Sequence, residues 1–329
     1  MKAEIIAELA QSYEGNFEIS KLLIKAAKSS GADSAKFQIV FADELATKDY
    51  EYYDLFRSLE MKDSDWLKLN KLAKTFDINL YADIFGLRSL KLAEKMNLRA
   101  VKVHGTDISN EALLETLSQS KIPRVFLGIG GAYKKEISQA VKILKNKKIN
   151  LMLGFQSYPT PNSANQISRI LLLRELYNNV EIGFADHSNP EKELSYILPL
   201  MALTLGANTI EKHLTLGKSM KMEDFESALN PDEFKIFVNL VKQSSKAYGK
   251  YNNKNDFGMS ASELSYRKII RRDVVSKKKI KKGDLILSSH LSLKRSAEKK
   301  AIKNLDIVIG KKALRDINKN TPLTKKDFE

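Results

Sequence analysis

The chain has 329 residues, of which 43% are apolar and 29% charged, as in globular proteins with a full hydrophobic core. It contains no cysteine, so disulfides, thiolate metal sites and cysteine nucleophiles are excluded, and a reducing cytoplasm is the expected setting. The net charge is +15, and residues 265–329 alone hold 20 Lys and Arg against 7 Asp and Glu. We expect neither a signal peptide nor a membrane helix, because Glu4 and Glu8 interrupt the first apolar run and no unbroken apolar run is long enough.

Apolar strand-like runs alternate with helix-like runs of period near 3.6 along the first 250 residues. The predicted strands begin near Ile5, Ser34, Asn79, Ala100, Arg124, Ile149, Glu181 and Thr209. Such alternation is typical of an α/β protein with a parallel sheet, and eight βα units indicate a (β/α)8 TIM barrel, whose chemistry lies at the carboxyl ends of the strands. A doubly wound open sheet is the alternative, but no glycine fingerprint follows the first strand.

Polar and small residues without an apolar period follow the predicted barrel. We therefore divide the chain into a barrel domain at 1–250, a linker at 251–264 and a small β-rich domain at 265–329, where short β-prone runs alternate with turn signals. The basic charge of this last domain is typical of a surface that binds an anionic polymer. Because it lacks an aromatic-rich run for base stacking, we do not expect nucleic acid as a partner.

Two successive predicted strands end in ionisable residues: Asp186 and His187 follow one, and Glu211, Lys212 and His213 follow the next. The carboxyl ends of barrel strands face a shared cleft, so these side chains are expected to lie close together. Neutral imidazole is the usual protein ligand of a borderline divalent metal. We therefore predict that His187 and His213 bind one such ion, with a purely structural role for each histidine as the alternative.

Three charged residues, Glu8, Lys36 and Lys102, interrupt apolar strands. Burial of a charge is costly unless the charge is paired or used. A carboxyl with a raised pKa suits proton transfer, while a barrel lysine can hold an anionic substrate, form a structural ion pair, or form a Schiff base as in class I aldolases. Gln38 lies two residues after Lys36 and therefore on the same face of its strand.

The sequence GFADHS, the segment LGANTIEKHLTL and an aspartate before SALNP resemble the sialic acid (N-acetylneuraminate) synthase family. The runs IAELAQSYEG, GADSAKFQ, AVKVHGTD, SYPTP and KKGDLIL fit the same family in the same order. The resemblance implies a TIM barrel followed by a SAF, or antifreeze-like, domain in a domain-swapped homodimer. The implied reaction condenses phosphoenolpyruvate with an N-acylated amino sugar to give a nonulosonic acid, which is a 2-keto-3-deoxy sugar acid, and phosphate.

Matching the motifs residue by residue assigns roles that remain implications of the resemblance. Glu8 would act in acid–base catalysis, and Lys36 and Lys102 would bind phosphoenolpyruvate. His187 and His213 would bind manganese, with magnesium or cobalt as alternatives. The remaining substrate-binding residues implied are Gln38, Asp107, Gln156, Tyr158, Asp224 and Arg295. The last of these, in the C-terminal domain, would reach the active site of a neighbouring subunit.

The chain departs from the family pattern in two places. On the acceptor side, the family's Asn-His-Asn-Gly and Gly-Pro-Asp motifs are replaced, here by Ser12, Tyr13, Met222 and Glu223. We therefore expect an acceptor other than N-acetylmannosamine, such as a precursor of legionaminic or pseudaminic acid.

On the phosphate side, small hydroxyl residues are replaced by Asp83, Gly105, Gly128 and Ala185. Asp83 should repel phosphate unless a lysine compensates for its charge, and backbone amides of residues 128–131 are candidate replacements for the lost donors. A Schiff-base pyruvate aldolase and a non-catalytic relative with an anion-binding tail remain the alternative functions.

Overall fold

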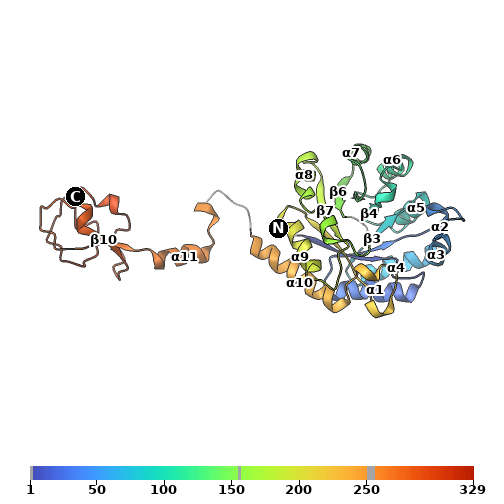
Figure 1. Ribbon diagram of the computed structural model, residues 1–329, viewed down its shortest axis with the longest axis horizontal. Helices are drawn as coiled ribbons and strands as arrows, with labels where there is room; N and C mark the ends of the chain where they lie inside the picture. The colour runs from blue at the N-terminus through green and yellow to red at the C-terminus, as the bar shows by residue number, and fades with distance from the viewer. Residues whose placement is uncertain (1–2, 155–156, 250–255) are drawn as a thin grey trace. The chain divides into compact units, whose positions relative to one another are not determined.

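The computed structural model describes residues 3–154, 157–249 and 256–329 (Figure 1). These residues form two compact units, Met1–Gly249 and Lys250–Glu329. Gln156, one of the predicted substrate-binding residues, lies outside the described residues. Within the described ranges, no helix has both the length and the apolar character needed to cross a membrane.

The first unit is a closed barrel of parallel strands that follow one another in sequence order (Figure 1), so the predicted TIM barrel is confirmed and the open sheet is wrong. The strands are β1 (Glu4–Ala10), β2 (Ser34–Gln38), β3 (Asn79–Ile84), β4 (Ala100–Val103), β5 (Arg124–Gly128), β6 (Lys148–Leu153), β7 (Glu181–Asp186) and β8 (Thr209–His213). Strand β1 pairs with both β2 and β8, which closes the barrel.

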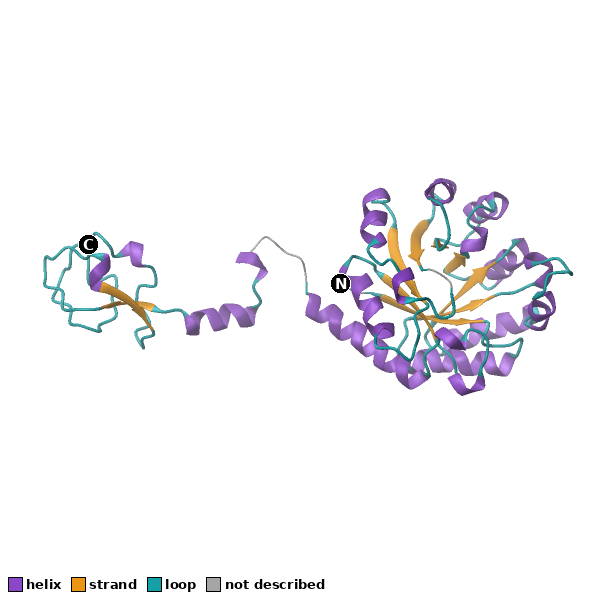
Figure 2. Ribbon diagram, viewed as in Figure 1, coloured by secondary structure: helices purple, strands orange, loops and turns teal. Residues whose placement is uncertain are grey.

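Helices surround the strands (Figure 2). They are α1 (Phe17–Ser29), α2 (Ala42–Leu45), α3 (Tyr53–Ser58), α4 (Asp63–Thr75), α5 (Leu87–Lys95), α6 (Glu111–Gln119), α7 (Lys134–Ile143), α8 (Arg169–Leu176), α9 (Leu194–Thr204) and α10 (Pro231–Tyr248). Short 3-10 helices lie in the loops at η1 (Gly105–Asp107), η2 (Asn162–Ala164), η3 (Lys218–Met220) and η4 (Phe225–Ser227). Helix α10 starts as its sequence predicts: the Asn230 N–H donates to the Glu233 carboxylate at 2.8 Å, and Pro231 occupies the first turn.

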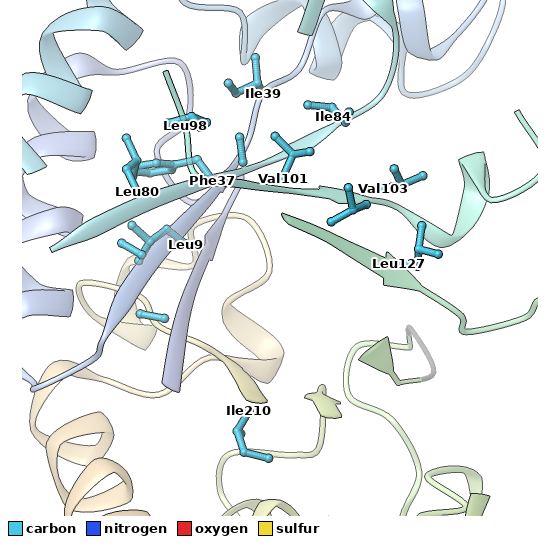
Figure 3. Close-up of a cluster of buried hydrophobic side chains, with 14 of the residues drawn as sticks. Leu9, Phe37, Ile39, Leu80, Ile84, Leu98, Val101, Val103, Leu127 and Ile210 are labelled. Atoms are coloured by element: carbon cyan, nitrogen blue, oxygen red, sulfur yellow. The ribbon is translucent and has the colours of Figure 1, made fainter. Parts of the chain in front are cut away.

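The main hydrophobic core lies between the outer faces of the strands and the surrounding helices. Figure 3 shows part of it, with Leu9 on β1, Phe37 on β2, Val101 and Val103 on β4 and Leu127 on β5. Residues that alternate with these along each strand face the barrel interior instead. The alternation explains why polar residues in these strands need not disturb the outer core.

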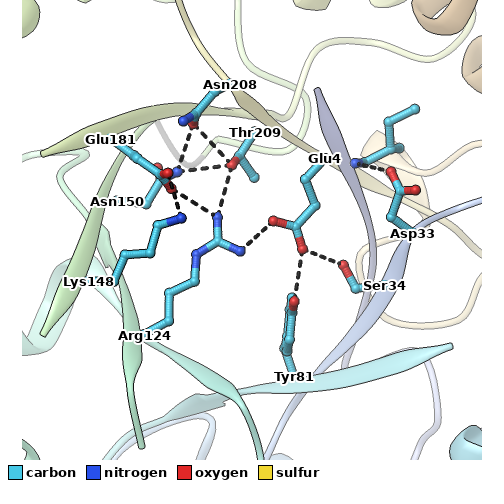
Figure 4. A network of polar contacts seen from close by, with 11 residues as sticks. Glu4, Asp33, Ser34, Tyr81, Arg124, Lys148, Asn150, Glu181, Asn208 and Thr209 are labelled. Carbon is cyan, nitrogen blue, oxygen red and sulfur yellow. Dashed lines mark hydrogen bonds and ion pairs between the residues drawn. The ribbon is translucent and has the colours of Figure 1, made fainter. Parts of the chain in front are cut away.

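The barrel interior is filled in layers, as is usual for this fold. At the starts of the strands lies a polar network (Figure 4), in which Glu4 accepts hydrogen bonds from Ser34 at 3.0 Å and Tyr81 at 2.9 Å and pairs with Arg124 at 2.5 Å. The next layer is apolar and consists of Ile6, Tyr81, Ala100, Phe126, Met152 and Ala185. Together these two layers fill the barrel interior between the starts of the strands and the charged residues at the carboxyl ends.

The second unit contains α11 (Ala261–Ile270) and the antiparallel pair β9 (Asp273–Ser276) and β10 (Leu291–Lys294), with the 3-10 helices η5 (Asp256–Gly258), η6 (Ser288–His290) and η7 (Leu305–Ile307). Its core consists of Val274, Ile280, Ile286, Leu291, Ile302, Val308, Ala313, Ile317, Leu323 and Phe328. Ser260 caps α11 by accepting the Glu263 N–H at 3.1 Å. Residues 261–264, which composition assigned to the linker, therefore belong to a helix.

Candidate active site

A layer of buried charges closes the barrel interior at the carboxyl ends of the strands. Lys36 is fully buried, contacts Glu8, and lies 2.7 Å from Asp83 and 3.6 Å from Glu211. Lys102 lies 2.5 Å from Glu211 and 3.9 Å from Asp83. The layer arises from strand register, because Glu8 pairs with Lys36 across β1 and β2, and Asp83 pairs with Lys102 across β3 and β4.

The structure brings the three predicted catalytic residues, Glu8, Lys36 and Lys102, into this one layer. Sequence reasoning did not predict Asp83 and Glu211 as members of it, although both were visible as ionisable residues within or at the end of a strand. Asp83 was expected to repel phosphate unless a lysine compensated for its charge, and its ion pair with Lys36 supplies that compensation. The layer thus contains three carboxyl groups and two ammonium groups.

Two carboxyl groups of this charged layer, those of Glu8 and Glu211, differ in the direction of their pKa shifts. Burial, assisted by Glu211 and Asp83, raises the pKa of Glu8 to about 8 against the opposing effect of Lys36. Burial also disfavours ionisation of Glu211, but Lys102 and Lys36 outweigh it and hold the pKa of Glu211 below its usual range. Near neutral pH, Glu8 therefore carries a proton while Glu211 is ionised. Carboxyl groups whose environments separate their pKa values in this way are suited to different roles in acid–base chemistry.

This proton on Glu8 should make stability depend on pH. The folded pKa of about 8 lies above the ordinary value of 4.5, so the folded state binds more protons between these values and loses stability as pH rises through that window. We expect the free energy of unfolding of the wild type to fall relative to that of Glu8→Gln as pH rises from about 5 to 8. Urea unfolding of both proteins across this range measures the difference, and a difference independent of pH would contradict the assignment.

His187 and His213 lie together at the carboxyl ends of β7 and β8, with ring centroids 5.0 Å apart. The ring of Tyr158 meets both edge-on, at centroid distances of 5.5 and 5.9 Å. Burial lowers the pKa of His187 to about 4 and that of His213 well below its usual value, so both imidazoles are neutral at physiological pH. The sequence-based expectation that the two histidines lie close together therefore agrees with the geometry.

These imidazoles suit two positions in the coordination shell of a divalent ion. The Nδ1 atom of His187 is buried and has no hydrogen-bond partner among the described residues, and a neutral ring nitrogen is a metal ligand. Within residues 3–154, 157–249 and 256–329, no three His, Cys, Asp or Glu side chains are grouped so that they could hold a metal by themselves. The remaining ligands of an ion held here would be water or substrate oxygens.

The remaining predicted residues occupy different places. Gln38 accepts a hydrogen bond from Gln11 at 2.7 Å in the barrel mouth, and Tyr158 is 40% exposed beside the histidines. Asp107 lies in η1 and accepts hydrogen bonds within its own loop. Asp224 has a left-handed backbone with φ 66°, and burial raises its pKa to about 7. Arg295 directly follows β10 in the second unit.

On the acceptor side, the structure corrects the expectation for Tyr13 and Met222. Tyr13 is fully buried, packs edge-on against Phe37 and Trp66, and donates its hydroxyl to the Gln38 carbonyl at 3.0 Å. Met222 is buried as well. Both side chains therefore stabilise the loops after β1 and β8 rather than line a substrate pocket. Ser12 ties these loops together through a 2.6 Å hydrogen bond to the Glu223 carbonyl.

On the phosphate side, the two glycines are required by close approach of the loops. A Cβ on Gly105 would lie 2.9 Å from the Gly130 carbonyl oxygen, and one on Gly128 would lie 3.0 Å from the Gly105 nitrogen. No side chain fits at either position without moving the backbone. Among the amides of residues 128–131 that were expected to replace the lost hydroxyls, the Ile129 N–H is already donated to the Met152 carbonyl at 3.2 Å.

A (β/α)8 barrel with buried lysines, carboxyls and a histidine pair at its catalytic end is the framework of a TIM-barrel enzyme. Residues 23–253 match the NeuB family and residues 271–329 match the SAF domain. The chain belongs to the NeuB family.

Individual relatives cover almost the whole chain. It is 33% identical over 318 residues to the uncharacterized protein MJ1065 of Methanocaldococcus jannaschii, covering 95% of this chain and 90% of that protein. It is 28% identical over 344 residues to the pseudaminic acid synthase of Campylobacter jejuni, covering 99% and 97%. The crystal structure of N-acetylneuraminic acid (sialic acid) synthetase from Leptospira borgpetersenii, solved with citrate, superposes with a TM-score of 0.74 at 27% identity, covering 82% of this chain and 93% of that one.

Proposed function

We propose that this protein is a transferase that condenses phosphoenolpyruvate with an N-acylated amino sugar, releasing a nonulosonic acid and phosphate. The observation that carries the proposal is the buried layer in which Lys36 and Lys102 lie among carboxyl groups at the catalytic end of a NeuB-family barrel. Relatives named pseudaminic acid synthase and sialic acid synthetase support the same class of reaction. A cytoplasmic setting stays a prediction from the absence of cysteine.

The proposed reaction forms one carbon–carbon bond and one carbon–oxygen bond to water, and it breaks the bond between carbon 2 and the bridging oxygen. Carbon 3 of the donor attacks the aldehyde carbon of the sugar, a water oxygen adds to carbon 2, and the phosphate leaves with its bridging oxygen. Lys36 and Lys102 bind the anionic groups of the donor, which must compete with Asp83 and Glu211 for them. Glu8 exchanges its proton with the oxygens on carbon 2, for which a pKa of about 8 is suited. Positioning and charge stabilisation supply the rate enhancement.

We also propose that His187 and His213 hold a divalent ion, for which manganese is the first candidate and magnesium or cobalt are alternatives. Two observations support this site. The two neutral imidazoles have ring centroids 5.0 Å apart, and the Nδ1 atom of His187 has no hydrogen-bond partner among the described residues. When bound, the ion would supply a positive charge that polarises the sugar aldehyde.

Metal binding should resist acid more than an ordinary histidine pair does. Because the pKa of His187 is about 4 and that of His213 is also well below 6.5, protons should compete with the ion only at a pH well below 6.5. We expect the manganese affinity to stay nearly constant from pH 7.5 to 5.5, whereas two histidines of pKa 6.5 would lose about a hundredfold at pH 5.5. Calorimetric titrations at three pH values measure this, and a loss beginning near pH 6.5 would contradict it.

Phosphate release from phosphoenolpyruvate, measured with a panel of amino sugars, tests the proposed function. We expect release to depend on the sugar, and an acceptor with two acylamino groups to surpass N-acetylmannosamine, because Glu223, whose carbonyl Ser12 holds in a loop at the barrel mouth, replaces the family pattern there. N-acetylmannosamine as the best acceptor would overturn this preference. Borohydride reduction with pyruvate tests the aldolase alternative, which a mass gain on Lys102 would favour.

We further propose a homodimer in which Arg295 serves the active site of the other subunit, as the family resemblance implies. The guanidinium group offers a fixed fork of donors that can orient sugar hydroxyl and amide groups. We expect Arg295→Ala to lower turnover without changing manganese affinity, and mixing it with His187→Ala to restore part of the activity. Mixtures with proven subunit exchange but no recovery would show that Arg295 does not act across subunits.

A further inference from the structure

A second buried ion pair lies next to the two histidines but outside the charged layer. Asp186 and Lys212 are both 0% exposed, and Lys212 Nζ lies 2.7 Å from Asp186 Oδ2. The two residues are register partners on β7 and β8. Because side chains alternate along a strand, they point away from the barrel interior, which the neighbouring His187 and His213 face. The reaction proposed above makes no use of this pair.

The ion pair joins the two strands one residue before each histidine. Asp186 precedes His187 and also accepts the Ser188 N–H through Oδ1 at 2.9 Å, while Lys212 precedes His213 and donates to the Ser188 hydroxyl at 3.3 Å. Two side chains of the β7 terminus, those of Asp186 and Ser188, thereby contact the single ammonium group of Lys212 on β8. A buried pair of charges is a costly way to join two strands, since apolar residues of similar size would serve stability as well. The placement of this ion pair directly before the two histidines therefore indicates that it positions the ends of β7 and β8.

The backbone carbonyls of the histidines are fixed as well. The His187 carbonyl accepts the Thr160 N–H at 2.7 Å and the Ser227 hydroxyl at 3.0 Å, and the His213 carbonyl accepts the Leu229 N–H at 3.0 Å. The hydrogen bonds to these carbonyls and the ion pair therefore both resist a shift of either strand end along its axis. The relative position of the two imidazoles is then set by the register of β7 and β8.

We propose that Asp186 and Lys212 are positioning residues that hold His187 and His213 at the spacing required to bind one divalent ion. The inference rests on the proposed metal site and extends it to residues that do not contact the ion. Groups behind the ligands of a metal commonly change its affinity by 10- to 100-fold. We expect the same range when this ion pair is removed without leaving an unpaired charge.

The double variant Asp186→Asn with Lys212→Met removes both charges and retains an oxygen that can accept the Ser188 N–H. We expect it to fold, because no charge is left uncompensated in the interior. Its manganese affinity, measured by calorimetry, should fall by about 10- to 100-fold. Lys212→Arg keeps a cation opposite Asp186 and should retain most of the affinity.

A matched control removes a different interior ion pair from the same barrel. Glu4 and Arg124 pair at 2.5 Å among the residues at the starts of the strands, on the far side of the apolar layer (Figure 4). The double variant Glu4→Gln with Arg124→Met should lower the melting temperature but leave manganese affinity unchanged. An equal loss of affinity in both double variants would show a general effect of stability and would overturn the positioning role.

Crystal structures of the metal-free proteins separate this inference from the proposed metal site. In Asp186→Asn with Lys212→Met we expect the two imidazoles to depart from their 5.0 Å centroid spacing, which the Glu4 and Arg124 variant should keep. If the wild type binds manganese and the Asp186 and Lys212 variant binds it equally well, the inference is wrong while the metal site stands. If the wild type binds no metal, the metal proposal is wrong, and unchanged imidazoles in the variant would overturn the positioning role as well.

Discussion

Lys36→Met should lower turnover strongly and also destabilise the barrel. Lys36 is fully buried and contacts Glu8, Asp83 and Glu211, so its removal leaves three carboxyl groups without their shared cation. Breaking a buried ion pair by removing one partner costs about 3–5 kcal/mol of unfolding free energy. Turnover should fall by about a thousandfold, because the donor also loses a positive charge in a water-excluded site. Urea unfolding and phosphate release measure the two effects.

A second variant separates stability from chemistry. Adding Asp83→Asn to Lys36→Met removes the carboxylate that lies 2.7 Å from the lysine and should recover part of the lost stability. It should not recover turnover, because the donor still lacks its cation. A Lys36→Met protein that remains active, or a double variant that regains turnover with its stability, would show that Lys36 is only structural.

Replacement of either histidine by alanine should have the second largest effect. Because His187 and His213 would supply the two protein nitrogens of the site, each variant should bind manganese at least a hundredfold more weakly and lose turnover in parallel. The measurement is a calorimetric manganese titration of each protein.

His290→Ala supplies a matched control, since this histidine lies in the second unit and its Nδ1 accepts a hydrogen bond from its own turn at 3.4 Å. Its manganese affinity and turnover should equal those of the wild type. Unchanged affinity in His187→Ala and His213→Ala would contradict the proposed metal site.

The charged layer also indicates what the donor must displace. With a proton on Glu8, the charges of Asp83 and Glu211 balance those of Lys36 and Lys102. An incoming donor with carboxylate and phosphate groups therefore exchanges places with protein carboxylates rather than entering an open cationic pocket. The family resemblance implies a small hydroxyl residue at the position of Asp83, so the carboxylate of Asp83 is one source of this competition.

The sequence predicted the barrel and much of the charged layer because both depend on local patterns. Each predicted strand begins within one residue of its observed start, for example at Glu4 instead of Ile5 and at Lys148 instead of Ile149. A charged residue inside an apolar strand, such as Lys36, is visible without knowledge of the fold. The identity of its partners is not, since Asp83 lies 47 residues away and reaches Lys36 only through strand register.

Loop residues were predicted less well than strand residues. A family correspondence places Tyr13 in a loop near the acceptor but does not give the direction of its side chain, which packs against Phe37 and Trp66 instead. The Asp186 and Lys212 pair was likewise seen only as two strand-end charges, because their contact depends on the register of β7 against β8. Local periodicity therefore gives the position of a residue along an element, while contacts between elements require the fold.

The fate of the bridging oxygen of phosphoenolpyruvate tests the central claim most directly. Donor labelled with 18O between carbon 2 and phosphorus is incubated with the protein, manganese and the best amino sugar, and the released phosphate is examined by mass spectrometry. If water adds to carbon 2, the label leaves in phosphate, in an amount equal to the sugar acid formed and only when the sugar is present. Unlabelled phosphate, or release that does not depend on the amino sugar, would contradict the proposed reaction.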